Sequence, residues 1–337
     1  MKNIKGSLIL LITALIWGTA FVAQTSASGT VNAFTFNMGR SVVAAMFLII
    51  VIGVRKLIYI KKKPTGDNVY SRRQTVVGGI ICGIILFAAN NFQQFGIGMY
   101  PEGVAASGRA GFLTATYVVM VSVAAIFFGK KPHPLVWVSA VGCIGGMYML
   151  CLSGGISGVY KADIFLLVCA VCYTAHIITI SRFPLADGLV FSLIQFAVCG
   201  VLSGIAMAVS GVGDISALLS VKFELFFAGV MSSGIAYTLQ ILGQKYAEPA
   251  VASIVLSLES VFSALAGWVV LNERLTNREL IGCALVFISV MLAQMPSFLS
   301  QNGRKKNVKT RKQHKIKQGN PKGFPGFYLK KKNWICL

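Results

Sequence analysis

Acidic side chains are scarce in this sequence. Its 337 residues include 10 Asp and Glu against 31 Lys and Arg, and charged residues of both signs make up only 12%. A soluble domain usually carries about 25% charged residues. Hydrophobic residues reach 55%, with a mean hydropathy of +0.73, which is more apolar surface than a soluble fold of this size can bury. The composition excludes an ordinary soluble enzyme, a disordered chain and a collagen-like chain, and it favours a polytopic membrane protein.

Residue groups that could run catalysis or hold a metal are also missing from the sequence. The eight cysteines are scattered, and the CxxC pair of Cys169 and Cys172 lies inside an apolar run without a second pair. This pattern favours small, reduced, buried thiols over a redox or metal site. No nucleophile and base occur together, and no metal-ligand spacing appears. We therefore expect no enzymatic activity, no cofactor and no bound metal.

Apolar runs of about 20 residues, the length that spans a bilayer, recur along the chain. Inside a bilayer such runs must satisfy their own backbone hydrogen bonds, so each is predicted to be a helix. The predicted spans are 6–26, 32–54, 75–98, 103–128, 134–152, 161–181, 188–210, 223–243, 250–271 and 279–296. The expected fold class is an all-α integral membrane protein with ten transmembrane helices.

Lys and Arg are distributed unequally between the two sets of loops. With the N-terminus inside, the inner loops hold 13 Lys and Arg before the C-terminal tail, whereas the outer loops hold 4. Cytoplasmic loops of membrane proteins carry the excess of basic residues. An even number of spans then places both termini in the cytoplasm of a multi-pass protein of the cell membrane.

Two stretches of the sequence resemble each other at an offset of 146 residues. Gln94 then aligns with Gln240, and Tyr100 aligns with Tyr246. The repeat divides the helices into five plus five, and because five is odd, the second copy enters the membrane in the opposite orientation. In transporters, inverted repeats place a substrate site near the membrane midplane, where the two halves meet. The predicted domains are 1–153, 154–297 and a basic tail, 298–337.

Three segments carry a resemblance to a known family. They are LIWGTAFV at 15–22, GFLTATYVVMVSVAAIFFGKKP at 111–132 and VASIVLSLESVFSALAGWVVLNERLTNRELIGCALVFISVMLA at 251–293. On these segments the chain resembles EamA-type members of the drug/metabolite transporter superfamily. It departs from their pattern at Ser260, where they usually have proline, and at Asn272, where they usually have glycine. The resemblance implies ten helices and secondary active transport of small organic solutes, often as export.

Three charged residues lie at least six residues from either end of a predicted span. Glu259 falls near the middle of its span, where a carboxylate costs about 3 kcal/mol or more. We interpret it as a proton-coupling or cation-binding group, with a structural ion pair to an arginine as the alternative. Arg40 is a candidate anchor for a substrate carboxylate, which a guanidinium binds with paired hydrogen bonds. The alternative is a helix-packing residue or a partner of Glu259. Arg109 lies nearer the outer end, and we expect it to reach the interface or to pair with Glu102.

Uncharged polar and aromatic residues inside the spans form a second set of candidates. Amides and phenols lining a cavity suit polar organic solutes, although amides also join helices by hydrogen bonds. A histidine in a span is a proton relay or a substrate contact, or else a hydrogen-bonded packing residue. A tryptophan lines a cavity or packs between helices. The candidates are Asn90, Gln94, Gln240, Tyr237, His176 and Trp17.

The C-terminal tail, 298–337, is the most basic part of the chain. Residues 301–337 hold 12 Lys and Arg and no acid. A basic cytoplasmic segment beside a membrane is drawn to anionic lipid, at about 1 kcal/mol per basic residue near the surface. The alternative is a topology anchor without a further role. Nucleic acid is not an expected partner, because no folded reading module accompanies the charge.

Together these features predict a transporter of small polar or amphipathic metabolites, amino-acid-like or drug-like. Alternating access is the expected mechanism, export the expected direction, and proton coupling or exchange the energy source. The alternatives are an importer, a sugar or nucleotide-sugar type of carrier, and a non-transporting membrane sensor. The expected partners are the small-molecule substrate, protons and the lipid bilayer, and a homodimer is left open.

Overall fold

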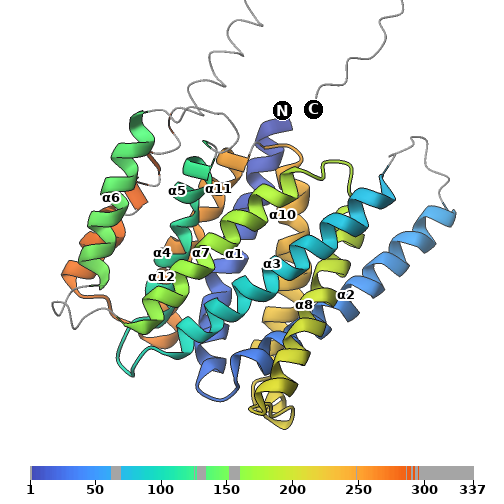
Figure 1. Cartoon of the computed structure of the whole chain (residues 1–337), viewed down its shortest axis with the longest axis horizontal. Coiled ribbons are helices and arrows are strands. Elements are labelled where there is room, and N and C mark those ends of the chain that lie inside the picture. The colour runs from blue at the N-terminus through green and yellow to red at the C-terminus, as the bar shows by residue number, and fades with distance from the viewer. Residues whose placement is uncertain are drawn as a thin grey trace, which may run out of the picture. The chain divides into compact units, whose positions relative to one another are not determined.

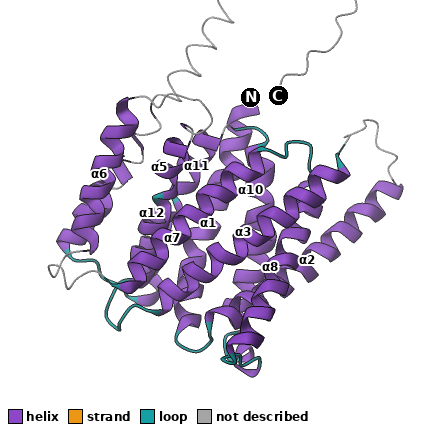
Figure 2. Cartoon of the chain, viewed as in Figure 1, coloured by secondary structure: helices purple, strands orange, loops and turns teal. Residues whose placement is uncertain are grey.

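Helices make up the regular structure of this chain, which is known from a computed structural model. The described residues are 2–61, 70–124, 126, 134–151, 160–247, 249–285, 287–289, 291–292 and 295, and no strand occurs among them (Figure 2). Residues 1–296 form one unit, and the predicted tail lies outside the described residues. The all-α fold is therefore confirmed for the described part of the chain.

The first half of the chain contains three long helices followed by three shorter ones. Each apolar run predicted above contains helix, and the bounds differ by a few residues at most ends. The elements are α1 (Lys2–Ser28), α2 (Ala33–Lys61), α3 (Arg72–Gly98), α4 (Ala106–Ala115), α5 (Tyr117–Ala124) and α6 (Pro134–Cys151).

The second half follows the same pattern with more interruptions. The elements are α7 (Lys161–Ser181), α8 (Gly188–Ser210), η3 (Ser216–Leu219), α9 (Lys222–Phe226), η4 (Phe227–Ala236), α10 (Tyr237–Gln244), α11 (Pro249–Ser257) and α12 (Glu259–Leu271). η4 is a π-helical segment within one continuous span, Lys222–Gln244. Residues 277–285 are helical too, and the predicted span 279–296 is described only in part.

Within the described residues, six helical stretches are long and apolar enough to cross a bilayer. They are Gly6–Ser28, Ala33–Ile58, Arg72–Gly98, Lys161–Ser181, Gly188–Ser210 and Lys222–Gln244. The structure is thus that of a multi-pass membrane protein, and the count of ten spans stays a prediction.

Two predicted spans are interrupted, which corrects the expectation of one unbroken helix in each. Thr116 separates α4 from α5, because its N–H and its hydroxyl both bond to the Leu113 carbonyl three residues back. Leu258 separates α11 from α12, and next to it the Ser260 hydroxyl donates a hydrogen bond to the Ser257 carbonyl. Hydroxyl side chains that compete for backbone carbonyls disturb the regular helical ladder in this way.

Helices of the first half pack mainly on helices of the second half. α1 lies against α12, η4 and α10, α2 lies against α8, and α3 lies against both α7 and α8 (Figure 1). Within the first half, α3 makes fewer contacts with α1 and α2. The interior of the described unit therefore lies between the halves, and residues far apart in sequence meet there.

Close helix approach depends on glycine at several places in this interior, two of which lie against α12. A Cβ atom at Gly18 of α1 would contact the Phe262 Cβ atom and lie 2.8 Å from the Glu259 carbonyl oxygen of α12. A Cβ atom at Gly111 of α4 would lie 2.8 Å from the Ser263 Cβ atom. Small residues let helix backbones approach in membranes, where apolar lipid gives no hydrophobic drive for association. Both contacts draw α12, which begins at Glu259, toward the first half.

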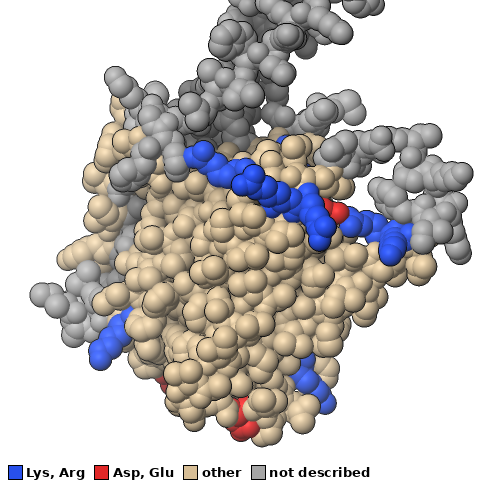
Figure 3. Space-filling model, turned by 45° about the vertical axis from the view of Figure 1, so that its right-hand side comes forward, with Lys and Arg blue, Asp and Glu red and all other residues tan. Residues whose placement is uncertain are grey.

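The surface that would face lipid is apolar, and charge gathers at its edge. Large side chains such as Ile50, Val141 and Val209 are 65%, 70% and 84% exposed. Figure 3 shows Lys and Arg gathered mainly along one edge of the face drawn, with other residues covering most of it. Exposing apolar side chains to lipid chains carries no free-energy penalty, whereas exposing them to water does. This surface therefore fits a bilayer.

Candidate functional site: a polar cavity between the halves

A small cavity of about 30 Å³ lies in the interior of the described unit. It has room for about two water molecules. Its walls come from both halves of the chain and combine aromatic, amide and charged side chains. The lining residues are Trp17, Ala20, Phe21, Gln24, Arg40, Gln93, Thr114, Tyr117, Tyr173, Ile177, Ser232, Tyr237, Gln240 and Glu259. Five of the nine residues predicted from sequence are among them.

Arg40 enters the cavity from α2 and is only 2% exposed. One terminal nitrogen donates to the Gln24 side-chain oxygen of α1 at 3.2 Å. Among the described residues, the Arg40 Nε atom has no hydrogen-bond acceptor. A buried donor without an acceptor is costly, so this guanidinium is chemically suited to an anionic group in the cavity.

Gln94 is linked to Arg40 only through Gln24. Its amide nitrogen donates to the Gln24 backbone carbonyl at 3.0 Å, which joins α3 to α1 behind Arg40. Gln94 does not line the cavity, whereas its repeat partner Gln240 does. The two glutamines that align in sequence therefore occupy different positions relative to the cavity.

Glu259 is the first residue of α12 and is 4% exposed. Its carboxyl group interacts with the Tyr117 side chain, the first residue of α5. Within the described residues, Glu259 forms no ion pair, so the alternative of a direct pair with Arg40 does not apply there. The two residues that follow the helix interruptions thus meet at the same wall of the cavity.

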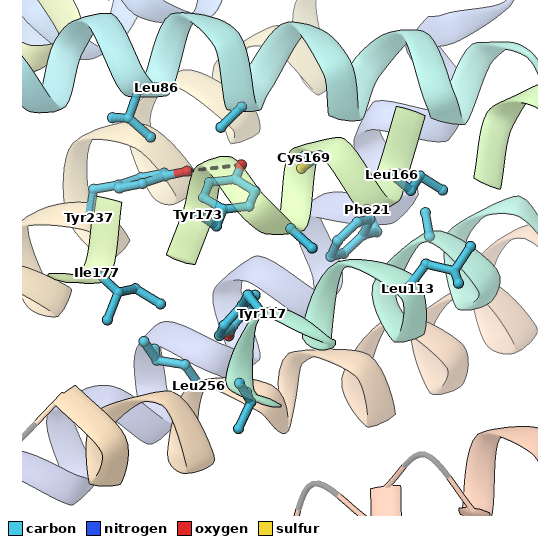
Figure 4. Packing of buried hydrophobic residues seen from close by; sticks show 14 of the residues in the cluster. Phe21, Leu86, Leu113, Tyr117, Leu166, Cys169, Tyr173, Ile177, Tyr237 and Leu256 are labelled. Carbon is cyan, nitrogen blue, oxygen red and sulfur yellow. Dashed lines mark hydrogen bonds between the residues drawn. The ribbon is translucent and has the colours of Figure 1, made fainter. Parts of the chain in front are cut away.

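Tyr237 and Tyr173 form a hydrogen-bonded pair on another wall. Their hydroxyl oxygens are 3.2 Å apart (Figure 4). The Tyr173 hydroxyl donates to the Asn90 side-chain oxygen at 2.9 Å. The Trp17 ring lies against the Tyr237 ring, with 4.7 Å between centroids. Asn90, 0% exposed on α3, therefore holds the two phenols in place without lining the cavity.

His176 lies behind this wall and is completely buried. Its Nε2 atom is 3.2 Å from the Gln195 side-chain oxygen, and its ring meets the Tyr237 ring edge-on at 5.8 Å. The structure places His176 outside the cavity lining. It has the surroundings of a hydrogen-bonded packing residue, which is one of the two alternatives considered from sequence.

Arg109 belongs to a separate ion cluster, and the expectation of a snorkelling side chain or a Glu102 partner is wrong. Arg109 is 1% exposed, and its Nε and terminal nitrogens bind the two Asp163 oxygens at 2.9 and 2.8 Å. Glu279 lies 3.7 Å from the other terminal nitrogen. The Tyr100 hydroxyl also donates to Asp163 at 2.6 Å. A bidentate pair with this many partners is a structural link between α4 and α7.

Several cavity residues were absent from the predicted set. Gln24 was not selected, although it is polar within an otherwise apolar run. Thr114 and Tyr117 lie in an apolar span, and their polar hydroxyl groups within that span were the available signal. Tyr173 and Phe21 resemble packing residues in sequence, and only the fold shows that they line a cavity.

Comparisons with known proteins agree with this arrangement. The model of the EamA-like transporter family matches residues 4–152 and 160–295. The chain belongs to the EamA-like transporter family. An "uncharacterized transporter" of Archaeoglobus fulgidus is 28% identical over 297 residues, covering 88% of this chain and 87% of that relative. A solved crystal structure named only as that of a protein is similar in fold, with a TM-score of 0.61 and 18% identity over 86% of this chain and 96% of that chain.

This EamA-family member is therefore a membrane transporter whose interior holds a cavity of opposite charges. Arg40 supplies a cation with a free donor, and Glu259 supplies a carboxylate without an ion-pair partner in the described part. Aromatic rings and amides line the rest of the cavity. Small-molecule sites use a few polar groups among aromatic side chains to fix the orientation of a ligand.

Proposed function

We propose that this protein exports small polar or amphipathic metabolites, amino-acid-like solutes in particular, by alternating access. The observation that carries the proposal is the presence of Arg40 and Glu259 in one enclosed, aromatic-lined cavity. Arg40 binds the carboxylate of the solute with paired hydrogen bonds. Glu259 binds its ammonium group, or a proton that is exchanged for the solute.

Ten helices arranged as two inverted halves would give this site its two-sided access. The two matches of the family model, to residues 4–152 and 160–295, support a division near residue 153. The interlocked packing of α1 on α12 and of α3 on α7 supports a cavity at the interface of the halves. Rocking of one half against the other then exposes the cavity to each side in turn.

The orientation and the cellular location form part of the same proposal. The excess of Lys and Arg in one set of loops supports cytoplasmic termini in the cell membrane. Arg55, Lys56, Arg72, Arg73, Arg182 and Lys245 are described residues of the basic set. The tail, 298–337, remains a candidate for binding anionic lipid.

Comparative metabolomics of culture medium tests the function. Cells express the wild type, Glu259→Gln, Arg40→Gln or an empty vector at matched membrane levels. We expect a few zwitterionic metabolites to accumulate outside cells with the wild type, and accumulation to fall to the vector level with either variant. Equal media in all four cultures would contradict export, and uptake assays would then test the opposite direction.

A further inference from the structure

A second space lies in a lateral groove between α1, α12 and the α9–η4 stretch. It has a volume of about 290 Å³ and shares none of its lining residues with the central cavity. Val22 and Ala23 of α1 form part of its floor, Val270 of α12 stands on one side, and Phe223 and Glu224 of α9 stand on the other. Both walls pack on α1, so the floor of the groove is held between them.

The rim of this groove is apolar and open. Phe223 is 77% exposed and Val270 is 63% exposed, which in a membrane places both in contact with lipid chains. The groove lies near one end of the bundle, because α1 ends at Ser28, α12 ends at Leu271 and α9 begins at Lys222. Its occupant therefore has access to hydrocarbon and to the headgroup region together.

Glu224 is the one charged residue among those that line the groove, and it is half-buried. No hydrogen bond or ion pair satisfies its carboxylate within the described residues. Two other glutamates at this end are satisfied. Glu273 accepts from the Ser107 backbone N–H at 2.9 Å, and Glu279 accepts from the Thr276 N–H at 2.8 Å. Glu224 is thus the acid of the groove itself that is left for a ligand.

We propose that this groove binds a phospholipid whose headgroup carries a primary ammonium. The ammonium donates charge-assisted hydrogen bonds to Glu224, which a quaternary ammonium cannot do. An acyl chain lies along Val22, Ala23 and Val270, because these walls offer nothing to a polar solute. Lys222, exposed and two residues before Glu224, is available to the phosphate of the same headgroup. This proposal does not depend on the substrate or direction of transport.

Native mass spectrometry of the full chain tests the proposal. The purified protein is mixed in detergent with equal amounts of phosphatidylethanolamine and phosphatidylcholine that carry the same acyl chains. We expect the wild type to retain the ethanolamine lipid about fivefold more, as one partly exposed ion pair allows, and Glu224→Gln to abolish the difference. Asp214→Asn is the matched control, because Asp214 is an exposed acid just before η3 that does not line the groove.

A steric variant separates the groove from a general effect of charge. Ala23→Phe fills the floor of the groove, so we expect it to reduce retention of both lipids while the protein elutes as the wild type does. A wild type without preference, a preference that persists in Glu224→Gln, or undiminished retention in Ala23→Phe would each overturn the proposal.

Discussion

Two arginines are almost completely buried in the described helices, Arg40 on α2 and Arg109 on α4, with 2% and 1% of their surface exposed. Arg109 has a bidentate carboxylate, a second carboxylate at 3.7 Å and two tyrosine rings within 5.6 Å of its guanidinium carbon. Arg40 has one amide oxygen and a nitrogen without an acceptor in the described part. The two arginines are thus buried to the same extent but differ in their partners. The protein supplies the carboxylates that bind Arg109, whereas Arg40 keeps a donor that a ligand can use.

Removing the charge of Arg109 is expected to have the largest effect. In Arg109→Gln the Asp163 carboxylate stays buried without its partner, which costs about 3–5 kcal/mol of folding free energy. Thermal unfolding in detergent, together with the yield of monodisperse protein, measures this loss. Arg55→Gln is the control, because the Arg55–Asp187 pair is 31% and 15% exposed and such pairs contribute about 1 kcal/mol or less. Equal losses in the two variants would contradict a special role for the buried cluster.

Removing the charge of Arg40 should instead leave the fold in place and reduce transport. Loss of a hydrogen-bonded charge contact to the substrate corresponds to about tenfold or more in transport at low substrate concentration. Arg40→Gln and Arg40→Lys are compared for melting temperature and for export per folded molecule. Lysine keeps the charge without the paired geometry, so it should recover only part of the activity. A variant that unfolds as Arg109→Gln does, while export per folded molecule survives, would make Arg40 a structural residue.

The close contact between Gly18 of α1 and the Glu259 backbone of α12 tests how tightly these two helices pack beside the cavity. Gly18→Ala adds a methyl group 2.8 Å from the Glu259 carbonyl oxygen, and overpacking of this kind costs about 1–3 kcal/mol. We expect a lower melting temperature and lower export, because α12 must shift. Gly53→Ala is the control, since a Cβ atom there meets nothing within 4 Å. A Gly18→Ala protein as stable as Gly53→Ala would show that α1 and α12 are loosely packed at this point.

The smallest effect is expected from a third basic residue, Lys245, which lies just after α10. Its ammonium donates to the Ala186 carbonyl, and partial burial holds the pKa of Lys245 below its usual range. A base with a lowered pKa in the folded state destabilises the fold while it is charged, and this penalty disappears as the pH rises toward the unfolded pKa. The melting temperature of the wild type should therefore rise slightly relative to Lys245→Gln between about pH 7 and about pH 10. A pH-independent difference between the two proteins would contradict this, and exposed Lys56→Gln is the control.

Most of the helices could be predicted from sequence because a bilayer demands long apolar runs. The predicted spans 161–181 and 188–210 coincide with α7 and α8. The interruptions at Thr116 and Leu258 could not be predicted from sequence. A hydropathy pattern does not report whether a hydroxyl side chain competes for a backbone carbonyl. The π-helical turns of η4 were missed for the same reason, as a π-helix and an α-helix share one apolar pattern.

The site was predictable where a charge interrupts an apolar run, and much less so elsewhere. Arg40 and Glu259 are visible in this way, and both line the cavity. The partner of Arg109 was not predictable, because Asp163 is 54 residues away and the pair depends on the packing of α4 against α7. His176 and Asn90 were selected for their chemistry, and both contact Tyr237 without lining the cavity. The His176 ring packs on the Tyr237 ring, and Asn90 accepts a hydrogen bond from the Tyr237 hydroxyl.

The distance along the chain between Arg109 and Asp163 also sets an order of events during synthesis. A ribosome adds about 5–20 residues per second, so several seconds separate the insertion of Arg109 from that of its carboxylate partner 54 residues later. For this interval the newly made first half carries the Arg109 guanidinium without its carboxylate partner. Its helices can close around that charge only after α7 has been delivered, and the second half therefore completes the assembly of the first.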